Sequence, residues 1–125
     1  MFRLTVRDHV MIAHSLRRPS FGPAQNLHGA TYVVELTLWR AELGPDSTVI
    51  DIGEAAGVLR TVLAELDYRN LDDHPAFEGL LSTTEVVARY VAEKVAGLLP
   101  LEGMSRLEVV LREHPDAWAG YVVEL

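Results

Sequence analysis

The sequence contains no cysteine, and this absence excludes several kinds of chemistry at once. Disulfides, thiolate nucleophiles, cysteine–zinc sites and iron–sulfur clusters all need a sulfur atom that this chain does not supply. Long apolar runs are also missing, since none approaches the ~18 residues of a membrane-spanning helix. The first residues lack the apolar core of a secretory signal. We therefore expect a cytoplasmic protein with no membrane partner.

Basic residues are few, with 11 Lys and Arg against 18 Asp and Glu, so the net charge is −7. This balance disfavours nucleic acid as a partner.

A hydrophobic content of 49% with 23% charged residues is typical of a globular chain, and the length predicts a single domain over residues 1–125. The basic pair Arg17-Arg18 either meets an anionic substrate group or belongs to a solvated loop.

Strand-like alternation of apolar and polar residues occurs twice near each end of the chain. Two helical patterns lie between these pairs of strands. The first begins at the N-cap Asp51, and the second begins at a capping box, Ser82 to Glu85, and ends before Pro100. The four predicted strands are 2–13, 30–43, 105–113 and 117–124, and a long loop spans 15–29.

The resulting order, β-β-α-α-β-β, predicts an α+β fold: an antiparallel four-stranded sheet with two helices on one face. Such a sheet leaves long strands unpaired at its edges, and exposed edges tend to pair with other chains. We therefore expect a homo-oligomer in which subunits join into a barrel.

Two histidines flank the long loop. His14 closes the first predicted strand and His28 lies just before the second, so pairing of these strands brings the two imidazoles together at one end of the sheet. Converging imidazoles are either metal ligands or structural side chains, and a catalytic zinc normally takes three protein ligands.

Asp67 and Tyr68 follow the first helix. A carboxylate beside a phenol can polarise it for proton transfer, and the alternative is a helix terminus followed by an Asx-type turn.

Glu113 ends the third predicted strand, where a carboxylate can accept two hydrogen bonds from an amidine-like N–H pair. The alternative is an ordinary surface glutamate. Thr83 and Thr84 lie at the start of the second helix, whose free N–H groups can bind polar ligand atoms. Simple capping of that helix by Ser82 is compatible with this role.

Taken in order, these segments resemble the 6-pyruvoyl-tetrahydropterin synthase / 6-carboxytetrahydropterin synthase family over nearly the whole chain. The resemblance is carried by Ala13-His14-Ser15-Leu16, Leu27-His28-Gly29, Val49-Ile50-Asp51-Ile52, the run from Leu66 to Asp72, Ser82-Thr83-Thr84-Glu85, Arg112-Glu113 and Ala119-Gly120-Tyr121. It implies the tunnelling fold, a homo-oligomer (a hexamer or tetramer) with active sites between subunits, and a pterin substrate.

The resemblance also assigns chemical roles, and three of the corresponding positions are altered here. Family members bind zinc through one histidine matched by His14 and two in a His-Gly-His motif, which here reads His28-Gly29-Ala30. The family's cysteine is matched by Ala24, and the histidine that assists it is matched by Tyr68.

The positions that hold the substrate ring are retained. The pterin-anchoring glutamate is matched by Glu113, and the threonines of the ring-binding segment by Thr83 and Thr84. The aspartate of the family's Leu-Asp-His motif is also retained, as Asp67. The residues that carry out the family's reaction are thus altered, whereas the glutamate that binds the ring is retained. This pattern indicates a pocket that still binds a flat ring but carries out different chemistry.

We therefore predict a divergent lyase or cyclase that acts on a small heterocyclic or carbonyl substrate. Its catalytic residues would be Asp67, Tyr68 and His28, its substrate would be held by Glu113, Thr83 and Thr84, and no tightly bound cofactor is expected. Zinc on His14 and His28 alone would be weak because the third ligand is missing. The alternatives are a zinc-dependent pterin synthase of the parent type and a non-catalytic oligomer that binds a pterin-like ligand.

Overall fold

The two N-terminal strands form a long antiparallel pair that positions half of the site. In this computed structural model, which describes all of residues 1–125, β1 (Phe2–His14) pairs with β2 (His28–Arg40) along its whole length. Alternation along these strands sends apolar residues to one face, where Val10, Tyr32 and Val34 are fully buried. The last rung of the ladder places His14 opposite His28.

Three further strands complete the sheet. β4 (Arg106–His114) pairs with β2, β5 (Ala117–Glu124) pairs with β4, and β3 (Arg69–Asn70) runs parallel to β1, giving the order β3-β1-β2-β4-β5. The predicted α+β class and its four long antiparallel strands are confirmed. The predicted number of strands is wrong by one, because two residues are too few for β3 to show a strand period.

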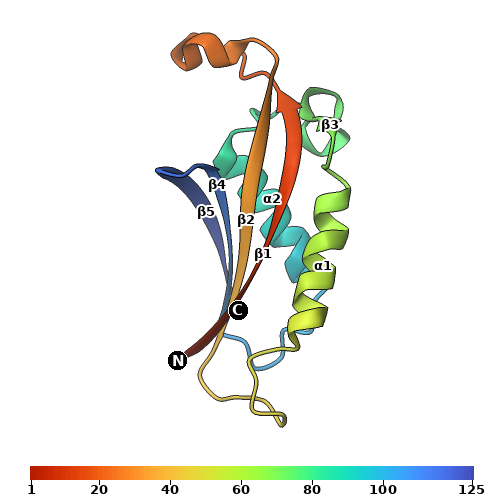
Figure 1. Cartoon of the computed structure of the whole chain (residues 1–125), viewed down its shortest axis with the longest axis vertical. Helices are drawn as coiled ribbons and strands as arrows, with labels where there is room; N and C mark the ends of the chain where they lie inside the picture. The colour runs from red at the N-terminus through yellow and green to blue at the C-terminus, as the bar shows by residue number, and fades with distance from the viewer.

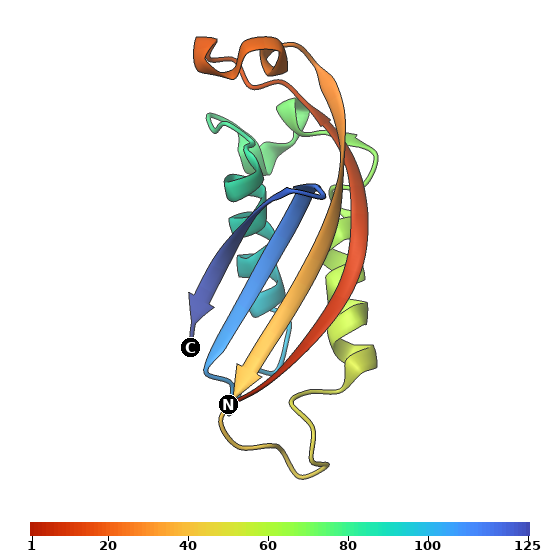
Figure 2. The ribbon, with the colours of Figure 1, turned by 60° about the vertical axis from the view of Figure 1, so that its left-hand side comes forward.

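Both long helices cover the same face of the curved sheet (Figures 1 and 2). Asp51 caps α1 (Ile52–Ala64) by accepting a hydrogen bond from the Glu54 N–H at 2.8 Å. The cap of α2 (Thr84–Ala96) is Thr83, whose hydroxyl accepts from the Val86 N–H, so the prediction that Ser82 caps this helix is wrong.

Several predicted boundaries shift. β2 covers 28–40 rather than 30–43, so His28 is a strand residue that shares a face with Ala30. The loop after β1 contains a 3₁₀ segment, η1 (Pro19–Gln25), and two more, η2 (Leu71–Asp73) and η3 (Pro75–Phe77), follow β3. α2 ends at Ala96, before Pro100.

The core lies between the sheet and the helices, where α1 contributes Leu59 and Leu63 and α2 contributes Val87 and Val91. Ile52 is exposed although its spacing places it on the predicted apolar stripe. No helix is both long enough and apolar enough to span a membrane.

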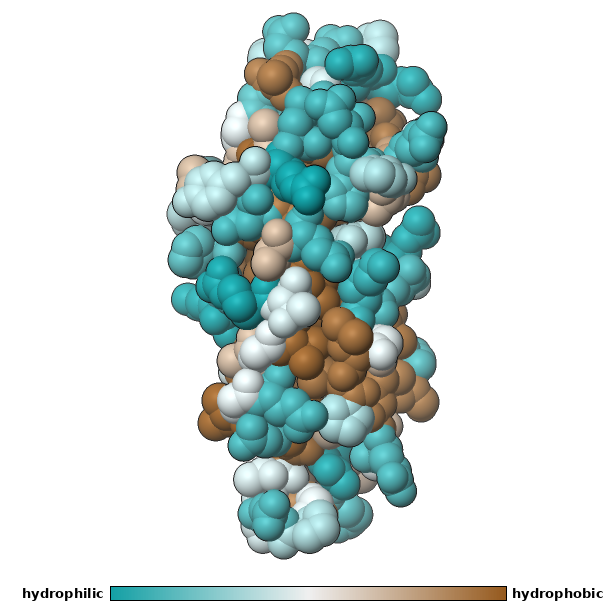
Figure 3. All heavy atoms as spheres, turned by 90° about the vertical axis from the view of Figure 1, so that its right-hand side faces the viewer, coloured by the Kyte–Doolittle hydropathy of each residue, from teal (hydrophilic) through white to brown (hydrophobic).

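The sheet keeps unpaired backbone at both edges. The outer edge of β1 is paired only where β3 meets it at residues 12 and 13, and β5 has no strand on its outer side. Figure 3 views the side of the molecule on which α1 lies, and apolar side chains gather in the lower half of that face.

Candidate functional site

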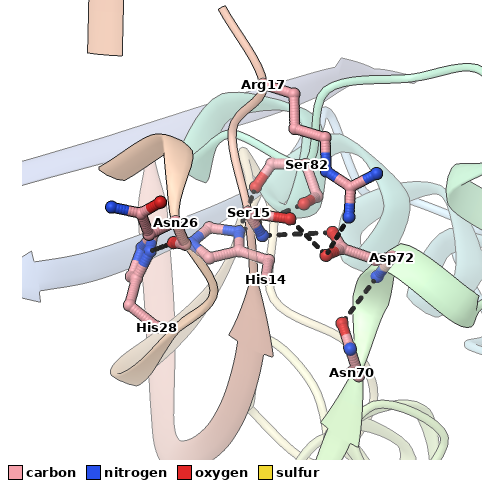
Figure 4. Close-up of polar contacts among 8 residues, drawn as sticks. All are labelled: His14, Ser15, Arg17, Asn26, His28, Asn70, Asp72 and Ser82. Carbon is pink, nitrogen blue, oxygen red and sulfur yellow. Dashed lines mark hydrogen bonds and ion pairs between the residues drawn. The ribbon is translucent and has the colours of Figure 1, made fainter. Parts of the chain in front are cut away.

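The structure confirms the predicted approach of His14 and His28. Their rings meet edge to face with centroids 4.6 Å apart, where β1 ends and β2 begins (Figure 4). His14 is buried among core residues, with 2% of its surface exposed, whereas His28 is partly exposed. One imidazole therefore belongs to the protein interior, and the other opens toward solvent.

Both histidines use the same ring nitrogen to hold their orientation. Nδ1 of His14 donates to the backbone carbonyl of Ser82 at 2.8 Å, and Nδ1 of His28 donates to that of Asn26 at 2.8 Å. A carbonyl oxygen only accepts, so each Nδ1 carries the proton and each neutral ring has its lone pair on Nε2. Burial lowers the pKa of His14 below its ordinary value, which keeps that ring neutral near pH 7.

The two histidines match two of the ligands of the zinc site that the family resemblance implies. The buried Nε2 of His14 has no hydrogen-bond partner, and a ligand histidine typically donates its other nitrogen to a carbonyl, as both do here. A third protein ligand is absent, because Ala30 occupies the position on β2 two residues from His28, on the same face. No group of three His, Cys, Asp or Glu side chains is arranged to hold a metal. The residues therefore do not fit a three-ligand zinc site.

Three consecutive residues connect the histidine pair to the start of α2. Ser82 is buried and presents its carbonyl and, at 3.1 Å, its hydroxyl to Nδ1 of His14. Thr83 caps the helix, and the Thr84 hydroxyl donates to Oε2 of Glu113 at 3.1 Å. This tripeptide therefore fixes the position of a histidine on one side and a carboxylate on the other.

Glu113 projects into a surface cavity of about 190 Å³ at the end of β4. Thr84 and Glu85 line one side of this cavity, and Trp118 with its two neighbouring alanines lines the other. Trp118 is 55% exposed, and the guanidinium of Arg112 lies 4.4 Å from its ring centroid. The cavity thus combines a fixed carboxylate with an exposed aromatic face, which suits a flat ring that carries N–H donors.

Asp67 and Tyr68 lie on the outer edge of β1. The Met11 N–H donates to Oδ1 of Asp67 at 2.9 Å, and the Tyr68 N–H donates to the Met11 carbonyl at 2.7 Å. Tyr68 is 80% exposed and has φ +59°, a left-handed conformation that is unusual for a bulky residue. Within one chain, no hydrogen bond or ring contact joins either residue to the histidines or to Glu113.

Asp72 closes the loop beside the histidines, as Figure 4 shows. It accepts hydrogen bonds from both the N–H and the hydroxyl of Ser15, and Nη2 of Arg17 lies 3.9 Å from its carboxylate. Burial pushes the pKa of Asp72 up, but the hydrogen bonds from Ser15 outweigh this effect and hold it below its ordinary value. Arg17 therefore has a partner within the protein. Ala24, at the family's cysteine position, accepts from the Leu16 N–H and helps to close the same loop.

Sequence reasoning missed three contributors to this region. The sequence pattern indicates a cap for Ser82 and only a place within a strand for Trp118 and Tyr32. Tyr32 is fully buried, and its hydroxyl has no hydrogen-bond partner. A tyrosine within an apolar stripe is itself a signal, since its hydroxyl needs a partner when it is buried.

Comparison with known proteins agrees with this fold. The family model described as 6-pyruvoyl tetrahydropterin synthase matches residues 3–124. The 6-carboxy-5,6,7,8-tetrahydropterin synthase of Bacillus subtilis is 30% identical over 126 residues, covering 96% of this chain and 84% of the relative.

Solved structures agree as well. The Caenorhabditis elegans 6-pyruvoyl tetrahydropterin synthase superposes with a TM-score of 0.84 at 28% identity, covering 96% of this chain and 94% of that one. The Plasmodium vivax 6-pyruvoyltetrahydropterin synthase gives a TM-score of 0.82 at 19% identity, covering 99% and 98%, a likeness of fold alone.

The antiparallel sheet with two helices on one face defines a tunnelling-fold protein of the α+β class. Within that class, the chain belongs to the 6-pyruvoyl tetrahydropterin synthase family.

Proposed function

We propose that this protein is a lyase-type enzyme that binds a pterin-like ring on Glu113 and carries out chemistry altered from that of its relatives. The observation that carries the proposal is the fixed carboxylate of Glu113, held by the Thr84 hydroxyl in a cavity beside Trp118. A 2-amino-4-oxopyrimidine ring presents two adjacent N–H donors, which match the two oxygens of one carboxylate. The relatives named above are synthases of pterins, which contain this ring.

Proton transfer in this proposal depends on histidine and tyrosine. His28 is the base, since its Nδ1 is held by a carbonyl and its Nε2 lone pair is free. Tyr68 donates a proton, and Asp67 fixes its position by binding β1. Thr83 and Thr84 hold the segment against which the ring docks, and no step depends on a resident metal.

The site in this proposal is shared between subunits. Tyr68 lies on the outer edge of β1, whereas Glu113 lies at the end of β4, two strands away in the sheet. A neighbouring chain that pairs with the free edge would place its own side chains beside Tyr68. The apolar patch on the α1 side of the molecule also favours assembly (Figure 3). We expect a hexamer or tetramer in light scattering.

The ring anchor is tested by calorimetric titration with pterin (2-amino-4-oxopteridine) and with lumazine, which carries a carbonyl in place of the 2-amino group. Pterin should bind and lumazine should bind at least ~10-fold more weakly, because its carbonyl faces the carboxylate without a donor. Glu113→Gln should remove this preference, and Glu102→Gln, on an exposed turn, should leave it unchanged. Equal binding of both compounds to the unaltered protein would contradict the proposal.

The altered chemistry is tested with 7,8-dihydroneopterin triphosphate as probe, with the Caenorhabditis elegans relative assayed in parallel. Absence of the thiol base alone predicts turnover slower by ~10²–10⁴-fold. Turnover comparable to that of the relative would identify a pterin synthase of the parent type. A stable complex in which no pterin is ever transformed would identify a binding protein.

A further inference from the structure

Tyr32 lies near Glu113, at the point where the pairing of their strands ends. The ladder between β2 and β4 stops where Val33 pairs with Arg112, and Tyr32 and Glu113 are the next residues along the two strands. Both residues lie on the helix-covered face, where Thr84 in the first turn of α2 donates to Glu113 and lies near the Tyr32 phenol. Tyr32 is fully buried, whereas Glu113 is exposed. The ring anchor therefore has a buried phenol as its neighbour.

The hydroxyl of Tyr32 has no hydrogen-bond partner in the unliganded protein. The side chain is fully buried. Thr84 is close enough to lower the pKa of Tyr32 but is not placed for a well-formed hydrogen bond. A buried unpaired hydroxyl is unfavourable, and a phenylalanine would fill the same space without that penalty. The phenol is therefore free to form a hydrogen bond when a ligand binds.

The hydroxyl of Thr84 is suited to link the two residues. It already donates its only proton to Oε2 of Glu113, at 3.1 Å, so its oxygen can accept a hydrogen bond from elsewhere. Burial, opposed by Thr84 and assisted by the negative charges of Glu113 and Glu85, raises the pKa of Tyr32 to about 12, so the phenol keeps its proton near pH 7. Tyr32 can thus act as a donor to Thr84.

We propose that Tyr32 is a positioning residue for the ring anchor: it donates to Thr84, which donates to Glu113, once a ligand occupies the cavity. The inference rests on the proposed function, since it assigns a partner to the carboxylate that binds the ring. In such a relay each hydrogen bond polarises the next, so the bond that Thr84 donates to Glu113 becomes stronger. The relay fixes the direction of Glu113 and favours its ionised form.

The test compares Tyr32→Phe with Tyr90→Phe. Tyr90 also has a pKa of about 12, and it donates to Glu65 on the far part of the helical layer, so it is a matched loss of one phenol hydroxyl outside the site. Affinity for pterin is measured by calorimetry from pH 4 to 7, and the thermal midpoint of each protein is measured without ligand. The charged or titratable groups that face Glu113 and Tyr32 are Glu85 on α2 and His14 on β1.

Tyr32→Phe should bind pterin ~3–10-fold more weakly, the loss expected for one hydrogen bond. Its midpoint without ligand should be unchanged or higher, and its pterin binding should fail at a higher pH than in the unaltered protein. Tyr90→Phe should bind pterin normally. Thr84→Val combined with Tyr32→Phe should bind no more weakly than Thr84→Val alone, because either change breaks the relay.

Three results would overturn the relay. Unchanged pterin affinity and pH profile in Tyr32→Phe would show that the phenol does not act on Glu113. If Tyr32→Phe binds pterin more weakly and its thermal midpoint without ligand also falls, Tyr32 contributes only to packing. Failure of the unaltered protein to bind pterin would instead overturn the proposed function, and the relay with it.

Discussion

His14 and His28 face each other across the last rung of the β1–β2 ladder, and each donates Nδ1–H to a backbone carbonyl. Both Nε2 lone pairs are thereby left free, one in the interior and one near solvent. The chain therefore has histidines at two of the three positions of a three-imidazole metal site, and Ala30 occupies the third position. The consequences of that single side chain can be tested directly.

Ala30→His should rebuild a three-imidazole site. Residues 28 and 30 of a strand share a face, so the new imidazole joins the existing pair. Since a catalytic zinc site normally has three protein ligands, zinc affinity measured by competition with a chromogenic chelator should rise by ~100-fold or more. Thr31→His is the matched control, because its side chain lies on the opposite face and should leave affinity unchanged. Equal gains in both variants would contradict the assignment.

Thr83→Ala and Thr84→Val should separate capping from ligand binding. Loss of the Thr83 cap should lower the free energy of unfolding by ~1 kcal/mol and weaken pterin binding less than loss of Thr84 does, because the Thr83 hydroxyl bonds to the helix backbone and not to Glu113. Loss of the Thr84 hydroxyl should weaken pterin binding, because it frees Glu113 from its hydrogen bond. Urea unfolding and calorimetry measure the two effects. A Thr84→Val protein with unaltered affinity would remove Thr84 from the site.

Tyr68→Gly should not destabilise the protein. A left-handed conformation such as the φ of +59° at Tyr68 costs an L-residue ~1–2 kcal/mol, and glycine avoids that cost. The exposed ring contributes little packing that could be lost. Arg69→Gly, next in the chain and also exposed, should instead lower the free energy of unfolding. If both variants lose equal stability in urea, the backbone of Tyr68 is not strained.

Glu35 should contribute stability that disappears in acid. The hydrogen bond from Arg7, assisted by Arg112 and opposed by partial burial, holds the pKa of Glu35 below its ordinary value. A carboxyl group whose pKa is lower in the folded state stabilises the fold above pH ~4.5 and loses that effect as the pH falls below it.

Glu35→Gln should therefore unfold more easily than the unaltered protein at pH 7, and the difference should shrink between pH 4.5 and 3. Glu108→Gln, on the same outer face but without an ion pair, is the control and should show no such pH dependence. A constant difference for Glu35→Gln across this range would contradict the pKa assignment.

The long elements of the fold could be predicted because each shows its own period. β1, β2, β4 and β5 alternate with period two, and Asp51 marks the start of α1. β3 could not be predicted, since its two residues pair with β1 through contacts distant in sequence. The start of β2 at His28 was also missed, because Gly29 and Ala30 interrupt the alternation.

The part of the site that depends only on strand register could be predicted from the sequence. The part that depends on how the helices pack on the sheet could not. Pairing of β1 with β2 brings His14 to His28 for any sequence in that register. The roles of Ser82 and Tyr32 depend on how the start of α2 lies over the ends of β1 and β2, and no local pattern encodes that contact.

The most direct test of the account is the zinc content of the protein purified without chelators and dialysed against metal-free buffer, measured by inductively coupled plasma mass spectrometry. Two imidazoles without a third protein ligand predict far less than one zinc per subunit after dialysis. A full equivalent of zinc that survives dialysis would contradict the claim that this chain keeps the ring pocket of its family without the family's metal chemistry.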